Sequence, residues 1–419
     1  MKNKRNEFTG CAAPIGSVVG LVGDPVHGAF PIGVLERELV GTIAFKRLLG
    51  VGQTLARLVV PTAVHSRHEH SLGVYYLALQ AVKHLKKEGG LRIEESVMGA
   101  FLISALLHDL GHGPFSHTLE GVLPSHETVG RWFIENGEIA EILQNYGVSP
   151  AQVADFIDPN RVSGVNRILS RILSAPIDVD KLDYIKRDLF YSGRHVPSLV
   201  LSTILGALTV HRDELVLRSE GVGYVLHMLA LRDELYGIYW HPVVRAYESM
   251  LTRAVQDALL RSALTPELIR CQDDKGLLDL LMDPERLSVR SVRELVSAFV
   301  VRNQYKEILS LEPTQAFYSR ARDPERRRLL EVQLAGQLSI EDHEILFVPP
   351  KRMGRDEPIR VLLPERTLLS WEEATGEDPR APRWPEIQQR AYVICAPDRY
   401  CDLIGKRQEI YDALMRALS

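Results

Sequence analysis

Cysteines are few in this sequence and form no pattern. Only four occur among 419 residues, and no two of them stand in CxxC spacing: Cys11, Cys271, Cys395 and Cys401. Thiolate zinc sites and the disulfide frameworks of small secreted domains need closely spaced or numerous cysteines. We therefore expect neither kind of site, and we expect a reducing compartment, the cytoplasm.

Long hydrophobic runs and a large net charge are also missing. No stretch reaches the roughly 18 apolar residues that a membrane-spanning helix needs, and the basic start at residues 1–7 has no apolar signal segment behind it. The formal net charge of −4 argues against a protein that coats nucleic acid. The sequence predicts no membrane contact, no strong nucleic-acid binding and a small-molecule partner.

Helical periodicity dominates the first two thirds of the chain. A β-branched run followed by turn residues predicts a short hairpin at residues 17–31. Apolar residues then recur at helical spacing, and glycines stand at several of the expected helix ends. The predicted helices are two within 32–49 and others at 70–85, 94–110, 127–136, 166–173, 178–191 and 224–264.

The pattern changes after residue 285, where charged helical stretches give way to short strand-like runs. We expect a mainly α protein with a short N-terminal β element, divided into a helical core at 1–284 and a small α+β domain at 285–419. The elements predicted in the second part are a helix at 292–305, strands at 344–348, 359–363 and 391–395, and a last helix at 398–418.

The densest chemistry lies in residues 106–117, LLHDLGHGPFSH. Four side chains that can bind a metal or move a proton occur here within ten residues: His108, Asp109, His112 and His117. Neighbouring residues on a helix point about 100° apart, so His108 and Asp109 can reach one ion only from a helix end. Gly111 supplies that end. Imidazole and carboxylate together suit Mn, Fe, Ni, Co or Zn better than Ca.

The missing ligands should come from other helix ends, and two further segments offer them. These are SRHEHSLG at 66–73, in which His70 opens a helix, and DVDKLDY at 178–184. His70, the pair His108–Asp109 and Asp180 stand in an order and spacing that resemble the HD-domain metal-dependent phosphohydrolases. The longer strings resemble one branch of that family, the deoxynucleoside triphosphate (dNTP) triphosphohydrolases, which include bacterial dGTPases and the SAM-and-HD-domain-containing enzymes.

This resemblance covers about residues 20 to 265 and implies an HD-domain helical core with one divalent transition-metal ion. The ligands it implies are His70, His108, Asp109 and Asp180. His117 matches the general acid that protonates the leaving 5′-oxygen. His112 and His126 would line the phosphate side, with Glu120, where the family usually has Asp, hydrogen-bonded to one of them. For His126 the alternative is a residue at a helix N-terminus without a role.

The resemblance also implies a set of substrate contacts. Asp180, Tyr184 and Asp188 fall at i, i+4 and i+8, on one helix face. The implied contacts are Arg67 with the α-phosphate, Lys181 with the outer phosphates, Arg232 with the terminal phosphate, Tyr239 with the deoxyribose, and Asp188 and Gln53 with the 3′-hydroxyl. The aromatic stripe around Tyr239 could instead be core packing. Pro242 predicts a kink or a helix start nearby, since proline cannot stand inside a helix.

The implied activity is metal-dependent hydrolysis of a dNTP, with dGTP as one candidate, to a deoxynucleoside and inorganic triphosphate. Mg could accompany the substrate. The resemblance further implies a dimer or tetramer with a nucleotide effector between subunits, but we interpret the basic run Arg320–Arg328 as a solvated helix face.

Two alternatives stay open. One is another HD-domain phosphohydrolase, acting on guanosine tetraphosphate or a cyclic dinucleotide. The sequence lacks the Glu-Asp pair of alarmone hydrolases after His108–Asp109, and it lacks a Gly-Tyr-Pro motif. The other alternative is a nucleotide sensor without turnover.

Overall fold

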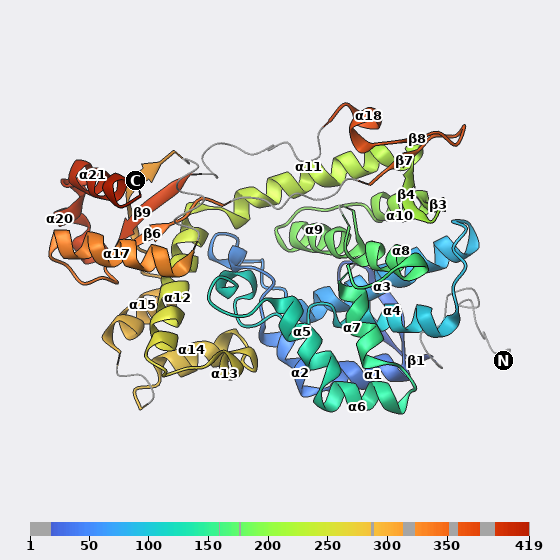
Figure 1. The fold of residues 1–419 in the computed structure, drawn as a ribbon, viewed down its shortest axis with the longest axis horizontal. Coiled ribbons are helices and arrows are strands. Elements are labelled where there is room, and N and C mark those ends of the chain that lie inside the picture. Colours follow the sequence, from blue (N-terminus) through green and yellow to red (C-terminus); the bar gives the residue numbers. More distant parts are fainter. Residues whose placement is uncertain are drawn as a thin grey trace.

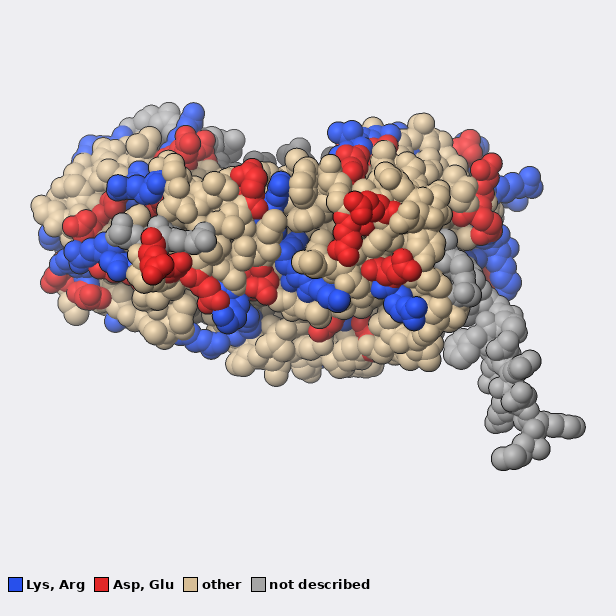
Figure 2. All heavy atoms as spheres, turned by 90° about the horizontal axis from the view of Figure 1, so that it is seen from below, with Lys and Arg blue, Asp and Glu red and all other residues tan. Residues whose placement is uncertain are grey.

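The computed structural model describes residues 18–158, 160–175, 177–285, 289–312, 323–351, 359–377 and 390–418. Within these ranges the protein is mainly helical, with three small sheets, so the predicted fold class is confirmed (Figure 1). No described helix combines the length and hydropathy that a bilayer crossing requires. Acidic and basic side chains are interspersed over the face shown in Figure 2.

The chain begins with the predicted hairpin and continues into short helices. Strands β1 (Val18–Asp24) and β2 (Gly28–Gly33) pair antiparallel, with Asp24 opposite Gly28 at the turn. The elements that follow are α1 (Val34–Gly41), α2 (Ile43–Arg47) and two 3-10 turns, Leu48–Gly50 and Leu55–Leu58.

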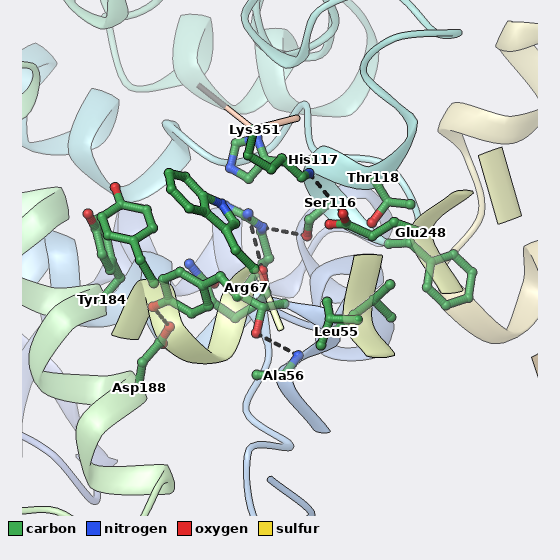
Figure 3. Close-up of a pocket in the computed structure, with 17 residues that line it drawn as sticks. Leu55, Ala56, Arg67, Ser116, His117, Thr118, Tyr184, Asp188, Glu248 and Lys351 are labelled. Atoms are coloured by element: carbon green, nitrogen blue, oxygen red, sulfur yellow. Dashed lines mark hydrogen bonds and ion pairs between the residues drawn. The ribbon is translucent and has the colours of Figure 1, made fainter. Parts of the chain in front are cut away.

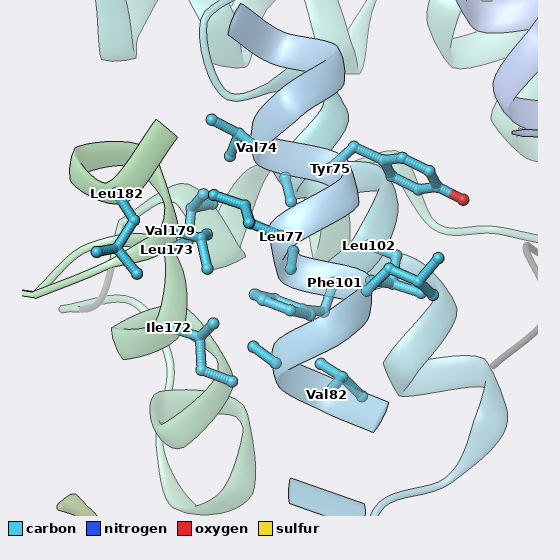
Figure 4. Close-up of a cluster of buried hydrophobic side chains, with 14 of the residues drawn as sticks. Val74, Tyr75, Leu77, Val82, Phe101, Leu102, Ile172, Leu173, Val179 and Leu182 are labelled. Carbon is cyan, nitrogen blue, oxygen red and sulfur yellow. The ribbon is translucent and has the colours of Figure 1, made fainter. Parts of the chain in front are cut away.

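Three helices form the centre of the core. They are α3 (Arg67–Lys87), α4 (Glu95–Leu107) and α9 (Val179–Tyr191). Helix α4 is apolar on every side, as a helix enclosed by others should be. Figure 4 shows α3 with Phe101 and Leu102 of α4 on one side and Leu182 of α9 on the other. The predicted metal ligands lie in the first turns of α3 and α9 and directly after the end of α4.

Further helices surround this centre, and a hairpin that the sequence did not reveal follows them. The helices are α5 (His126–Glu135), α6 (Gly137–Asn145), α7 (Pro150–Ile157), α8 (Gly164–Leu173) and α10 (Ser198–Ala207). The hairpin consists of β3 (Leu208–His211) and β4 (Glu214–Arg218). Its turn residues Arg212 and Asp213 have φ of 51° and 59°. Glycine or asparagine usually occupies such left-handed turn positions, and because neither stands here the sequence did not indicate the turn.

The predicted single helix at 224–264 is wrong. The chain forms α11 (Val222–Tyr239) and α12 (Pro242–Leu260) instead. Pro242 stands at the first turn of α12, where its missing N–H costs nothing, and the His241 side chain caps the helix by accepting from the Val243 N–H. The expectation of a helix start near Pro242 is confirmed.

Helices α13 (Pro266–Arg270), α14 (Asp274–Met282) and α15 (Arg290–Val300) lead into the second part of the chain. There β5 (Lys306–Leu311), β9 (Ala391–Cys395) and β6 (Ile345–Val348) form an antiparallel sheet in that order. The helices next to it are α17 (Pro324–Leu338), α20 (Tyr400–Ile404) and α21 (Arg407–Leu418). Two short helices thus replace the single one predicted at 398–418. Of the basic run, residues 320–322 lie outside the described residues.

One segment of this second part lies against the helical core. The strand-like run at 359–363 is reduced to β7 (Val361–Leu362), which pairs parallel with β4 and antiparallel with β8 (Leu368–Leu369). Helix α18 (Trp371–Thr375) follows, and Trp371 is buried in the large core cluster. The boundary at 284/285 stays a prediction, and contacts cross it.

Candidate metal centre and active site

The structure brings the four predicted metal ligands together. His70 lies in the first turn of α3, His108 caps the end of α4 with Asp109 directly after it, and Asp180 lies in the first turn of α9. The His70 Nε2 lies 3.0 Å from Asp180 Oδ1 and 3.6 Å from Asp109 Oδ2. The His108 Nε2 lies 3.4 Å from Asp109 Oδ1 and 3.8 Å from Asp180 Oδ1.

The hydrogen bonds around these two histidines leave one nitrogen of each ring for a metal. The His70 Nδ1 lies 2.7 Å from Asp183 Oδ2, and the His108 Nδ1 lies 2.9 Å from the Ala105 carbonyl oxygen. If each Nδ1 donates, each Nε2 presents a lone pair. Both Nε2 atoms are buried without a hydrogen-bond partner. Two imidazole Nε2 atoms and two carboxylates therefore converge, and this donor set fits a divalent transition-metal ion.

The charges of the cluster also favour a cation. Burial lowers the pKa of His70, but the carboxylates of Asp180, Asp183 and Asp109 outweigh burial and raise it to about 10. Burial opposes ionisation of Asp109, yet Arg67 and the neighbouring histidines hold its pKa well below the ordinary range. The site thus keeps its carboxylates ionised at neutral pH.

Asp183 connects the metal cluster to a buried network that the sequence reading missed. Besides His70, it contacts the His27 Nε2 at 2.6 Å and the Arg187 Nε at 2.8 Å. Arg187 also donates to Asp24 at 2.8 Å, so the hairpin turn is linked to α9. A side chain at Gly73 would place its Cβ 2.0 Å from Asp183 Oδ1, and only glycine leaves room for this carboxylate. The only sign of Asp183 in the sequence was its position three residues after the predicted ligand Asp180.

The loop after α4 is held by close backbone contacts. A Cβ at Gly111 would lie 1.9 Å from the His126 carbonyl oxygen, so the loop and the start of α5 can touch only with glycine there. Arg47 donates to the backbone oxygens of Leu110 and His112, each at 2.7 Å. These contacts fix the direction in which the loop leaves the helix.

Phe115 and Ser116, later in the same loop, have φ of 57° and 49°, a left-handed conformation that is strained for such side chains. The strain is compensated by Asp274 at the start of α14, whose Oδ1 accepts from the Phe115 N–H at 2.7 Å. His117 follows directly, so this turn sets its position.

A second cluster contains the predicted catalytic residues. Glu120 Oε1 lies 2.8 Å from His117 Nδ1 and 2.6 Å from His126 Nδ1. The rings of His112 and His126 stack with centroids 4.0 Å apart, and the His112 Nε2 lies 3.3 Å from Asp109 Oδ1. Glu120 therefore contacts His126, one of the two histidines expected, and His117 as well.

Electrostatics separate the members of this second cluster. Burial and the charge of Arg67 hold the pKa of His112 well below its ordinary value. Burial lowers the pKa of His126 less than the hydrogen bond to Glu120 raises it, so its net shift is upward. The two histidines lower the pKa of Glu120 despite burial. Glu120 is an anion that orients two rings through their Nδ1 atoms.

A cavity of about 320 Å³ opens beside the two clusters (Figure 3). The predicted site residues that line it are Gln53, Arg67, His117, Tyr184, Asp188 and Tyr239. His112, Glu120 and His126 are not among the lining residues and lie in the cluster next to it. Lys181 and Arg232 also do not line it. Lys181 donates to Asp178 and to the Ala175 carbonyl oxygen at 2.8 Å each, and Arg232 lies over the Tyr236 ring, 5.9 Å from its centroid.

Several lining side chains are fixed in place. Arg67 donates to Asp109 at 2.6 Å and so connects the cavity to the metal cluster. Asp188 lies 2.6 Å from the His65 Nε2 and accepts a hydrogen bond from the Tyr239 hydroxyl. Among the lining residues that the sequence did not single out, Ser116, Tyr236 and Trp240 neighbour predicted residues, whereas Glu248 and Lys351 come from distant segments.

Comparisons with known proteins agree with this arrangement. A model described as HD domain matches residues 67–184, and one described as HD associated region matches residues 201–368. An uncharacterized protein of Bacillus subtilis is 34% identical over 240 residues, covering 56% of this chain and 55% of that protein. The human deoxynucleoside triphosphate triphosphohydrolase SAMHD1 is 28% identical over 348 residues, covering 70% of this chain and 55% of that protein. The chain thus spans about half the length of these relatives.

A solved structure shows the same fold. A crystal structure described as a phosphohydrolase of Bacteroides thetaiotaomicron superposes with a TM-score of 0.70 at 24% identity, covering 90% of this chain and 99% of that one. The HD-domain match begins at Arg67 and ends at Tyr184, so it contains all four converging ligands. The chain therefore contains an HD domain at residues 67–184, followed by an HD-associated region at residues 201–368.

Proposed function

We propose that this protein is a metal-dependent dNTP triphosphohydrolase that releases a deoxynucleoside and inorganic triphosphate. The observation that carries the proposal is the convergence of two buried histidine Nε2 atoms and two aspartates beside a cavity of about 320 Å³. That volume lies within the range of small-molecule sites. The similarity to relatives named as dNTP triphosphohydrolases supports the choice of substrate.

The residues that would hold the ion are His70, His108, Asp109 and Asp180. A divalent ion in such a site lowers the pKa of a bound water and polarises a phosphoryl oxygen. Metal analysis of the purified protein identifies which of Mn, Fe, Ni, Co and Zn the site takes.

The protein's own side chains then have separate tasks. Arg67 places a fixed cation beside Asp109, where an α-phosphate would lie. The cleaved bond leaves its electrons on the 5′-oxygen, and His117, which lines the cavity, would protonate that oxygen. Glu120 accepts from the His117 Nδ1, which orients the ring.

The sugar would occupy the part of the cavity lined by Tyr239, Asp188 and Gln53. The Tyr239 ring is held by its hydrogen bond to Asp188, so it can exclude a 2′-hydroxyl by contact. The Gln53 Oε1 is a buried acceptor without a partner and could accept from the 3′-hydroxyl. Lys181 and Arg232 are kept as candidates for the outer phosphates, which they would reach only after moving from their present contacts.

The test is a product assay with each of the four dNTPs and added Mn or Mg, separating triphosphate, pyrophosphate and orthophosphate. Wild-type protein should release triphosphate and deoxynucleoside in equal amounts, while His108→Ala and Asp109→Ala variants release none. Pyrophosphate or orthophosphate as the first product would favour a different HD-domain phosphohydrolase, and binding of a dNTP without any product would favour a sensor.

Assembly into a homodimer or homotetramer, with a nucleotide effector between subunits, is a separate proposal. Sedimentation with and without nucleotide tests it, and a monomer under both conditions would contradict it.

A further inference from the structure

Two side chains with a permanent positive charge line the cavity within the described residues, and they are held differently. Arg67 is buried and donates to Asp109 and to the Gln53 carbonyl oxygen. Lys351 is 38% exposed, and its Nζ lies 2.8 Å from Glu248 Oε2. Arg67 is therefore a fixed part of the metal site, whereas the ammonium of Lys351 can change partners.

Lys351 comes from the C-terminal region, three residues after β6, yet its backbone is fixed against the helical part. The Arg245 Nη2 on α12 donates to the Pro349 carbonyl oxygen at 2.5 Å. Arg245 itself is fully buried, and its guanidinium lies 4.7 Å from the centroid of the Tyr392 ring in β9. Glu248, the partner of Lys351, lies three residues further along the same helix. Helix α12 thus fixes both the backbone near Lys351 and the carboxylate that receives its side chain.

The ion pair between Lys351 and Glu248 is of the kind that a substrate can displace. Both side chains are partly exposed, at 38% and 19%, and solvent screening leaves such pairs weak. A phosphate oxygen offers the ammonium a stronger, charge-assisted hydrogen bond. In Figure 3 Lys351 is at the top of the cavity and Asp188 at its lower left, so the lysine lies away from the proposed sugar site.

We infer that Lys351 is a substrate-binding residue that leaves Glu248 and contacts the outer phosphates of a nucleoside triphosphate. This inference rests on the proposed function and deepens it. Glu248 holds the ammonium at the cavity before the substrate enters and competes with the phosphates for it. The C-terminal region would then supply part of the active site. Recognition of the triphosphate would depend on the contacts that hold α12 against the sheet containing β6 and β9.

The experiment compares Lys351→Gln and Glu248→Gln with the control Lys87→Gln, which alters an exposed ammonium 3.0 Å from Glu88. Binding of a dNTP and of the matching dNMP is measured by calorimetry, with His117→Asn in every protein to slow turnover. Lys351→Gln should weaken dNTP binding about 10- to 100-fold, as loss of a hydrogen bond to a charged group does, and leave dNMP binding unchanged.

Glu248→Gln distinguishes a phosphate-binding role of Lys351 from a purely structural role of the ion pair, called here a structural latch. Glu248→Gln removes the competing carboxylate, so dNTP binding should stay the same or tighten. If both variants weaken dNTP and dNMP binding alike, the pair is a latch and the inference is overturned. It is also overturned if Lys351→Gln binds dNTP like the control.

These outcomes are distinguishable from failure of the proposed function. Wild-type protein that binds dNTP but never releases triphosphate contradicts the proposed reaction alone, because the binding comparison needs no turnover. A protein that binds no dNTP contradicts both.

Discussion

Asp183 lies 2.7 Å from the Nδ1 of His70, on the side of the ring opposite the metal cluster. The carboxylate accepts a hydrogen bond from the Nδ1–H and so leaves the Nε2 to face an ion, an arrangement that also raises the basicity of a ligand histidine. Burial opposes ionisation of Asp183, but Arg187 and two histidines hold its pKa well below the ordinary range. Asp183 therefore stays ionised at neutral pH.

Replacing this carboxylate should weaken metal binding without removing a ligand. We expect Asp183→Asn to lower metal affinity about 10- to 100-fold, the usual effect of losing such an outer contact. A competition titration with a chromophoric chelator measures it. The control is Asp155→Asn, which alters a half-exposed carboxylate 2.8 Å from Arg131 on α5. Equal metal affinity in both variants would show that Asp183 does not act on the ion.

Gly73→Ala tests the contact between Asp183 and His70 by steric displacement rather than by removal of charge. The new Cβ would lie 2.0 Å from Asp183 Oδ1 and 2.4 Å from the Arg187 Nη2, so the buried pair must move. Lower thermal stability and weaker metal binding should appear together. In the control Gly336→Ala, on an exposed face of α17, no atom lies within 4 Å of the new Cβ. That variant should gain up to about 1 kcal/mol in free energy of unfolding from helix propensity. A Gly73→Ala variant with wild-type thermal stability and metal affinity would contradict this packing.

The local sequence signalled the helix ends at which the candidate ligands stand, and the resemblance to the HD-domain family selected His70, His108, Asp109 and Asp180 among the residues there. Gly111 follows His108–Asp109, and Asp178 caps the helix that presents Asp180. Asp183 and Lys351 could not be predicted in the same way. The role of Asp183 depends on Gly73 leaving space on another helix, and Lys351 reaches the cavity through Arg245 and a sheet formed by distant strands. The division of 224–264 into two helices was signalled locally, by Pro242.

His117→Asn should separate binding from turnover. A general acid typically contributes 100- to 10,000-fold to a rate, so we expect a loss in kcat of about that size with little change in dNTP affinity. Single-turnover kinetics and calorimetry measure the two quantities. A variant with wild-type kcat would assign protonation of the 5′-oxygen to another group.

The pairing of Glu120 with His126 predicts a pH dependence of stability. Burial lowers the pKa of His126, but hydrogen bonding to Glu120 raises it above the ordinary 6.5, so this contribution is complete below pH 6.5 and is lost as pH rises through the folded value. Burial raises the pKa of Glu120, but His117 and His126 lower it below the ordinary 4.5, so its contribution is present above pH 4.5 and is lost as pH falls.

The difference in unfolding free energy between wild type and Glu120→Gln should therefore be largest between pH 4.5 and 6.5 and shrink on both sides. Denaturant titrations across the pH range measure it. Glu135→Gln serves as the control, because Glu135 pairs with Arg131 and no histidine titrates in that contact. A difference that is constant with pH would show that the carboxylate does not stabilise charged histidine.

The most direct test of the account is hydrolysis of a dNTP in ¹⁸O-labelled water, with mass spectrometry of both products. Attack at the α-phosphorus breaks the bond to the 5′-oxygen, so the account predicts one labelled oxygen in the released triphosphate and none in the deoxynucleoside. Label in the deoxynucleoside, or a labelled pyrophosphate or orthophosphate as the first product, would contradict it.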